Sequence, residues 1–273
     1  MKKIKLRKNL CADALIARVA KNFKKIPDHR AKEPQIKLTD GLMSAYAMFS
    51  IKSSSMLQFM ENAKKKNLHN IFLIEKVPSD THMRVMLDDI DPDSLRPAFT
   101  DIFRQIQRGK NLEQMVFFNG CYLVSLDGTG YFFSDKINCA NCLVKSSKTG
   151  QAKYYHQMLG AAIVHPDRRE VIPFYPEAII KQDGDNKNDC ERNAAKRFLK
   201  KFRQDHPYLP VIIIEDALSA NAPHIDQLRR YNCQLYLGLT GCLKSVILSG
   251  AKRSREPVPS LSREIPLARE RLI

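Results

Sequence analysis

Two aspartates in the second half of the chain each follow a short apolar run. Asp127 comes directly after residues 122–126, and Asp216 comes just after the β-branched run 211–214. Because strand ends place side chains at the sheet edge where open α/β proteins bind ligands, we expect the two carboxylates to meet there. Carboxylates at close range repel unless they share cations, and Mg²⁺ binds a few carboxylates together with water and phosphate oxygens. The pair therefore predicts a two-metal site, with Mg²⁺ or Mn²⁺, for phosphodiester chemistry.

The sequence also allows two other interpretations of Asp127. Asp127-Gly128 is a common turn pair, so the aspartate could simply shape a turn. A phosphatase of the haloacid-dehalogenase type also has Asp-Gly-Thr after an apolar strand, but it needs a nucleophilic aspartate two residues before the second one. Ser125 occupies that position here and cannot form an aspartyl-phosphate. Two aspartates after two apolar strands favour the metal site over both alternatives.

Cysteines suggest a second, different metal site. Cys139 and Cys142 have the Cys-x-x-Cys spacing of half a zinc site. Cys190 and either His156 or His165 are available to complete it in space. The chain has no second Cys-x-x-Cys pair, so reduced thiols on a hairpin are the simpler interpretation.

The elements that position these residues follow from the apolar patterning. The predicted strands are 116–118, 122–126, 158–164, 171–174, 211–214 and 233–239, with helices at 189–203 and 221–230. From residue 122 onward the order is β-β-β-α-β-α-β, which is expected of a ribonuclease-H-like domain. We therefore predict an α/β fold, with a mixed sheet flanked by helices, over residues 115–240.

The residues before this domain are basic and helical in pattern. The whole chain has 273 residues, with 45 Lys and Arg against 29 Asp and Glu, which gives a net charge of +16. Residues 1–66 alone hold 16 basic against 5 acidic residues. Apolar stripes at helical spacing predict four helices. The first ends near Pro27, and the other three begin near Asp40, Ser79 and Asp93. We expect residues 1–114 to form an all-α region that binds double-stranded DNA.

Composition excludes several protein classes. The sequence contains no apolar run of the roughly 18 residues that a membrane helix needs. Seven cysteines in 273 residues indicate a reducing compartment rather than a disulfide framework. The basic N-terminus has no apolar segment behind it and so does not predict a secretory signal.

Seven short stretches, in order, resemble one known group of proteins. They are IPDHR at 26–30, PSDTHMR at 78–84, LDGT at 126–129, YYHQ at 154–157, VHPD at 164–167, KNDCE at 187–191 and IEDAL at 214–218. With these stretches, the chain resembles the DDE transposases of bacterial insertion sequences, whose catalytic domain is ribonuclease-H-like. The resemblance implies that Asp127 and Asp216 are the first two metal-binding acids. It also implies that water nicks the transposon ends and that the freed 3′-hydroxyl then attacks target DNA. The implied location is the bacterial cytoplasm, at the nucleoid, and the implied assembly is a homodimer.

The resemblance does not extend to a third acid. The family pattern places a Glu on a helix well after the second Asp, followed by Tyr, Arg and Lys. Glu256, Glu264 and Glu270 are available, but they lie in the Arg/Ser/Pro-rich segment 241–273, without helical periodicity. We therefore expect an irregular tail and a truncated, inactive transposase copy. The alternative is a non-catalytic DNA-binding remnant that occupies transposon ends.

Overall fold

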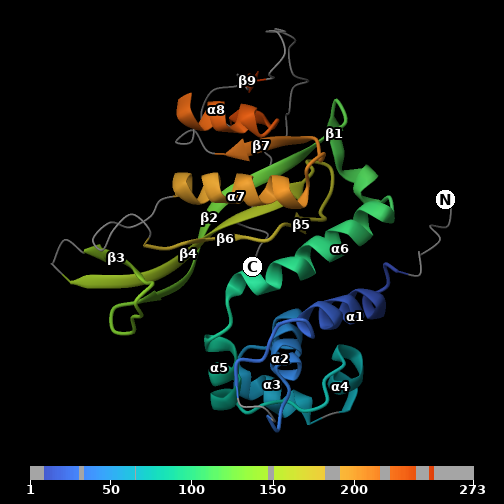
Figure 1. The fold of residues 1–273 in the computed structure, drawn as a ribbon, viewed down its shortest axis with the longest axis vertical. Helices are drawn as coiled ribbons and strands as arrows, with labels where there is room; N and C mark the ends of the chain where they lie inside the picture. The colour runs from blue at the N-terminus through green and yellow to red at the C-terminus, as the bar shows by residue number, and fades with distance from the viewer. Residues whose placement is uncertain are drawn as a thin grey trace. The chain divides into compact units, whose positions relative to one another are not determined.

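A computed structural model describes residues 9–30, 34–64, 66–146, 151–181, 191–215, 222–237 and 246–248. Its contacts divide the chain into two compact units, Met1–Asn111 and Leu112–Ile273. Each unit is described separately, and Figure 1 labels the elements of both.

The N-terminal unit is helical. It contains α1 (Ala12–Phe23), α2 (Leu38–Ser50), α3 (Met56–Ala63), α4 (Lys66–Phe72), α5 (Asp80–Asp88), a short 3-10 helix (Pro92–Leu95) and α6 (Arg96–Arg108). Their apolar faces share one core, which includes Met43, Phe59 and Met83, all completely buried. The all-α N-terminal region and its four predicted helices are confirmed. Helices α3 and α4 were not predicted.

The C-terminal unit is built on one mixed sheet. Its elements are a 3-10 helix (Asn111–Met115), β1 (Val116–Phe118), β2 (Cys121–Ser134), β3 (Leu143–Ser146), β4 (Ala152–Val164), β5 (Ile172–Pro173), β6 (Glu177–Ile179), α7 (Glu191–Asp205), β7 (Val211–Glu215), α8 (Ala222–Arg230), β8 (Gln234–Leu237) and β9 (Val246–Leu248). The main strand order is β3-β4-β2-β7-β8-β9, and β1, β5 and β6 pair with β2 or β4. Strand β2 is antiparallel to β4 and parallel to β7, and β7 is parallel to β8. A mixed sheet flanked by helices confirms the predicted α/β class and is consistent with a ribonuclease-H-like fold.

The two faces of this sheet differ in what covers them. Helix α7 contacts β2, β4 and β6 as well as α8, and both helices lie in front of the sheet in Figure 1. We call this side the helix face. Side chains alternate along a strand, so alternate residues of β2 face the opposite side. There, Cys121 and Leu123 form an apolar cluster with residues of β4 and β7, against which Phe117, Phe118 and Val171 pack.

Strand β2 corrects two expectations about Asp127. The strand was expected to end at residue 126, but it continues to Ser134 and pairs with β4 beyond Asp127. Asp127-Gly128 therefore lies inside a strand, so the turn interpretation is wrong. The apolar run stops at Leu126 because the outer part of the β2–β4 arm is only partly buried, not because the strand ends.

The last predicted segment contains some regular structure. Strand β9 pairs antiparallel with β8, with Tyr236 opposite Ile247, inside the segment expected to be irregular. The other residues of 241–273 lie outside the described part of the chain.

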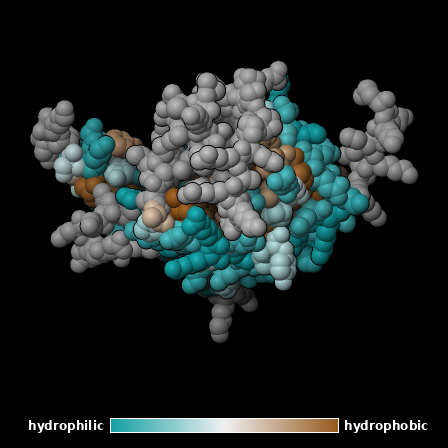
Figure 2. Space-filling model, turned by 90° about the horizontal axis from the view of Figure 1, so that it is seen from above, coloured by the Kyte–Doolittle hydropathy of each residue, from teal (hydrophilic) through white to brown (hydrophobic). Residues whose placement is uncertain are grey.

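Among the described residues, no helix is both long and apolar enough to cross a membrane. On the face drawn in Figure 2, the coloured surface is mainly hydrophilic, with smaller hydrophobic areas.

A buried hydrogen bond between a histidine and a glutamate fixes α8 against the end of β7. Nε2 of His224 lies 2.6 Å from Oε2 of Glu215, and the two side chains are only 3% and 5% exposed. Glu215 is the last residue of β7 and directly precedes Asp216. Two buried partners in direct contact hold the helix at a fixed position on the strand, since separating them would leave a desolvated polar group unpaired.

Removing one partner of this pair should destabilise the unit. We expect His224→Ala to lower the free energy of unfolding by roughly 2–4 kcal/mol, because the Glu215 carboxylate stays buried without its partner. Urea unfolding followed by circular dichroism measures this. The matched control is Asp226→Ala on the same helix, where the exposed pair with Arg229 should contribute less than about 1 kcal/mol. An equal loss of unfolding free energy in both variants would contradict the larger contribution expected of the buried pair.

Candidate functional site

Asp127 lies where β2 leaves its parallel neighbour. It is half-buried, its Oδ2 atom is inaccessible to solvent, and it pairs with Gly160 of β4. The last parallel pair of β2 and β7 is Ser125 with Ile214. Asp127 lies two residues after Ser125 in β2 and therefore on the same strand face, and in the sequence Asp216 comes two residues after Ile214. Asp216 itself lies outside the described residues.

The sheet face that carries Asp127 also carries a second polar group. Ser125 is 2% exposed and lies two residues before Asp127, among the apolar residues of the cluster on this face. Its Oγ atom is buried and has no hydrogen-bond partner among the described residues. A buried hydroxyl and a carboxylate on one face are oxygen donors of the kind that hydrated Mg²⁺ uses, so the donor chemistry here fits that ion.

The packing of α7 explains why residue 128, the second of the Asp-Gly pair, is a glycine. A Cβ atom at this position would overlap the carboxylate of Glu191, the first residue of α7. Alternation along β2 puts Gly128 on the helix face and Asp127 on the opposite face. The glycine is therefore needed for close packing of α7, and Glu191 does not share a face with Asp127.

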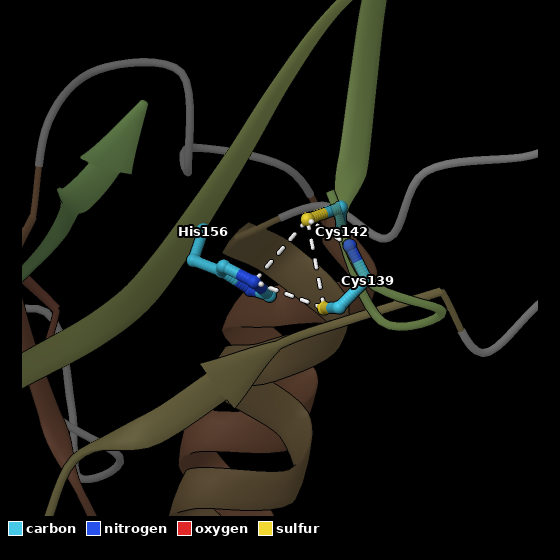
Figure 3. A group of neighbouring side chains, drawn as sticks. All are labelled: Cys139, Cys142 and His156. Carbon is cyan, nitrogen blue, oxygen red and sulfur yellow. Dashed lines mark hydrogen bonds between the residues drawn. The ribbon is translucent and has the colours of Figure 1, made fainter. Parts of the chain in front are cut away.

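A group of two cysteines and one histidine lies elsewhere in the unit. Sγ of Cys139 and Sγ of Cys142 are 3.6 Å apart, and each lies 3.3 Å from Nε2 of His156. Figure 3 shows the three side chains pointing toward one another, with His156 on β4 and both cysteines on the connection that leads into β3. This is the group of described residues whose ligand atoms are arranged to hold a metal ion.

The surroundings hold these three side chains in place. The backbone N–H of Cys142 donates to the carbonyl of Cys139, and the N–H of Cys139 donates to Sγ of Cys142. The ring of His156 stacks on Tyr131, with centroids 5.8 Å apart, and also contacts Phe132. Burial raises the pKa of the Cys142 thiol above its usual value, while the positive charge of Lys181 opposes this shift.

The structure therefore brings together three of the four residues proposed for zinc. Cys190 lies outside the described residues. His165, the other histidine considered, is not part of the group: its Nδ1 accepts a hydrogen bond from the backbone of Asp167, and its ring packs against Phe117. Spacing alone identified the cysteine pair, but only the β4 register shows which histidine faces it.

An aromatic groove on the outer β2–β4 arm was not predicted. It has a volume of about 510 Å³ and is lined by Gly130, Tyr131, Phe132, Phe133, Lys145, Tyr155 and Gln157. Tyr131 and Phe133 are 60% and 62% exposed. Lys145 of β3 pairs directly with Lys153 of β4, whose Nζ lies 5.5 Å from the centre of the Phe133 ring. The signal in the sequence is the run of three aromatic residues at 131–133, which lies beyond the strand expected at 122–126.

Comparison with known proteins adds little to this geometry. No family model matches the chain, and no curated protein is significantly similar to it in sequence. Among solved structures, the chain is similar to one in a crystal structure of a pre-cleavage Mos1 transpososome, with 9% identity and a TM-score of 0.22. The match covers 77% of this chain and 61% of that one, so this chain spans about three fifths of the other's length. At this TM-score the similarity carries no argument about function.

Proposed function

We propose that the chain is a transposase-type DNA-processing protein, in which Asp127 and Asp216 hold Mg²⁺ for cleavage of phosphodiester bonds. The observation that carries the proposal is the register of β2 and β7. Ser125 of β2 pairs with Ile214 of the parallel strand β7, and in the sequence each candidate acid comes two residues after its member of this pair. Metal ions at such a site activate the attacking oxygen and stabilise the leaving one.

The sheet topology supports this assignment. The central strand β2 has an antiparallel neighbour, β4, on one side and a parallel neighbour, β7, on the other. Helix α7 connects the two sides and covers the face opposite to Asp127. Asp127 is therefore left on the side of the sheet that does not carry α7, beside a buried hydroxyl group.

The aromatic groove supports DNA as the partner. Single-stranded nucleic acids bind to exposed aromatic rings, on which bases stack, next to basic residues that contact phosphates. Tyr131 and Phe133 supply such rings, and Lys145 and Lys153 supply the positive charge. Like charges directly opposite each other on neighbouring strands repel, and a bound phosphate would relieve that repulsion. By strand alternation, Tyr155 and Gln157 of β4 lie on the face opposite to Gly160, the partner of Asp127, so the groove is a binding surface separate from the carboxylate site.

Catalysis should depend on the two aspartates. Without a recognised third acid we expect no strand transfer, but the two-aspartate site predicts that the protein with Mg²⁺ or Mn²⁺ nicks supercoiled plasmid, and that Asp127→Asn or Asp216→Asn slows nicking by roughly 100-fold or more. The reason is that metal ions supply several kcal/mol of transition-state stabilisation, and each 1.4 kcal/mol is tenfold in rate. Supercoiled plasmid is a suitable substrate because its relaxation reports a nick at any sequence.

The control for this experiment is Asp135→Asn, which makes the same change at an exposed position just after β2. It should nick like the parent protein. Nicking that persists in Asp127→Asn purified in parallel would contradict the assignment. Salt-dependent DNA binding with no nicking by any variant would instead support the non-catalytic remnant.

DNA binding should weaken when the groove loses its charge. We expect Lys145→Glu combined with Lys153→Glu to reduce the affinity for single-stranded DNA and to lower the slope of log K against log salt by up to about 1.4, since each phosphate contact contributes roughly 0.7. Fluorescence anisotropy at several salt concentrations measures both effects. Lys200→Glu, on the exposed side of α7, is the matched charge control. An equal decrease in the salt slope in that variant would contradict DNA binding in the groove.

A further inference from the structure

We propose that Cys139, Cys142 and His156 bind a zinc ion at a site distinct from the carboxylate site. The two cysteines come from the connection before β3, and the histidine comes from β4. Their ligand atoms, two sulfurs and one ring nitrogen, lie close together. Nothing in the proposed cleavage chemistry requires this group, so it needs its own explanation.

The distances between the three ligand atoms are those of one face of a zinc tetrahedron. With Zn–S near 2.3 Å and Zn–N near 2.0 Å, tetrahedral geometry puts two sulfurs about 3.8 Å apart and a sulfur and nitrogen about 3.5 Å apart. The observed separations are 3.6 Å between the sulfurs and 3.3 Å from each sulfur to Nε2 of His156. One ion can therefore reach all three atoms with no rearrangement of the backbone.

The donor chemistry of the group favours zinc over a hard cation. The two sulfurs are 3.6 Å apart and not bonded to each other, whereas an S–S bond is about 2.05 Å long. Two thiolates with one imidazole form a soft donor set that selects zinc over Mg²⁺ or Ca²⁺. The N–H of Cys139 donates to Sγ of Cys142 over 3.2 Å, and this hydrogen bond orients the sulfur within the group.

The site is separate from the proposed magnesium site. His156 pairs with Phe132, whereas Asp127 pairs with Gly160, four residues further along β4. Four residues of extended strand span roughly 13 Å, too far for one ion or one bridged pair of ions to join the two groups. The donor sets also differ, with sulfur and nitrogen in one case and oxygen in the other.

Zinc would fasten the loop after β2 to strand β4. The loop begins with Ser134, whose Oγ accepts hydrogen bonds from the N–H groups of Lys136 and Ile137, and it ends at Cys142, next to β3. Binding Cys139 and Cys142 to His156 closes this loop onto β4. Tyr131 both stacks on His156 and lines the aromatic groove, so the ion would also hold one wall of that groove in place.

The test is the metal content of untagged protein, purified with a non-chelating reductant and no chelator. We expect about one zinc per chain by mass spectrometry in the parent protein, and most of it lost in Cys139→Ser and in His156→Ala. Cys11→Ser is the matched control, because Cys11 is an exposed cysteine of the N-terminal unit and should leave the zinc content unchanged.

A second measurement keeps the proposal testable if a variant folds poorly. Protein stripped of metal should take up Co²⁺ and show sulfur-to-cobalt charge-transfer absorption, and added Zn²⁺ should raise its melting temperature, because the ion binds only the folded chain. Parent protein that contains no zinc and takes up neither ion would overturn the proposal. Full zinc content in folded Cys139→Ser and His156→Ala would also overturn it. Both readouts are independent of DNA cleavage.

Discussion

Strand β2 pairs with β4 from Leu123 opposite Val164 out to Ser134 opposite Tyr154, and with β7 along its inner half. This long antiparallel contact positions each candidate residue that the structure describes in the C-terminal unit. The inner half sets Asp127 beside the end of β7, and the outer half sets His156 near the cysteine loop. A shift of one residue in this register would turn every side chain of β2 to the other face. The register shifts once, between Gly130 and Phe132, so the proposed Asp127 and His156 sites depend on two successive runs of pairing between the same strands.

The register also separates neighbouring acids into different roles. Glu215 faces the helix side of the sheet, where His224 of α8 pairs with it. Ile214, one residue earlier, faces the other side and belongs to the apolar cluster with Leu123. The residues of β2 follow the same rule. Ser125 and Asp127 share the face of the apolar cluster, while Gly128, on the helix face, leaves space for the side chain of Glu191. Strand alternation thus assigns packing to one set of residues and leaves the other set available for chemistry.

Much of this arrangement could be predicted from the sequence, and the reasons for the failures are physical. The buried inner strands and the inner face of α7 carry continuous or periodic apolar residues, so their positions were predictable. The outer arm was not, because residues such as Tyr131, Phe133 and Lys153 are partly exposed and lack the apolar signal of a core strand. The cysteine pair could be recognised from spacing, but the choice of His156 over His165 depends on pairing across β2, β3 and β4, which no local pattern encodes.

The link between the arm and the cysteine group gives zinc a physical role. The outer part of β2 and β4 has fewer buried side chains than the inner part, because most of its residues are half-buried or exposed. Strand β3 adds four residues of pairing at the edge, from Leu143 opposite Tyr155 to Ser146 opposite Ala152. A metal ion that ties the β2–β3 connection to β4 supplies the missing constraint at the point where the apolar core ends. The same ion would stiffen the surface on which Tyr131 and Phe133 are exposed, and stacking on bases is stronger when the rings are already held in place.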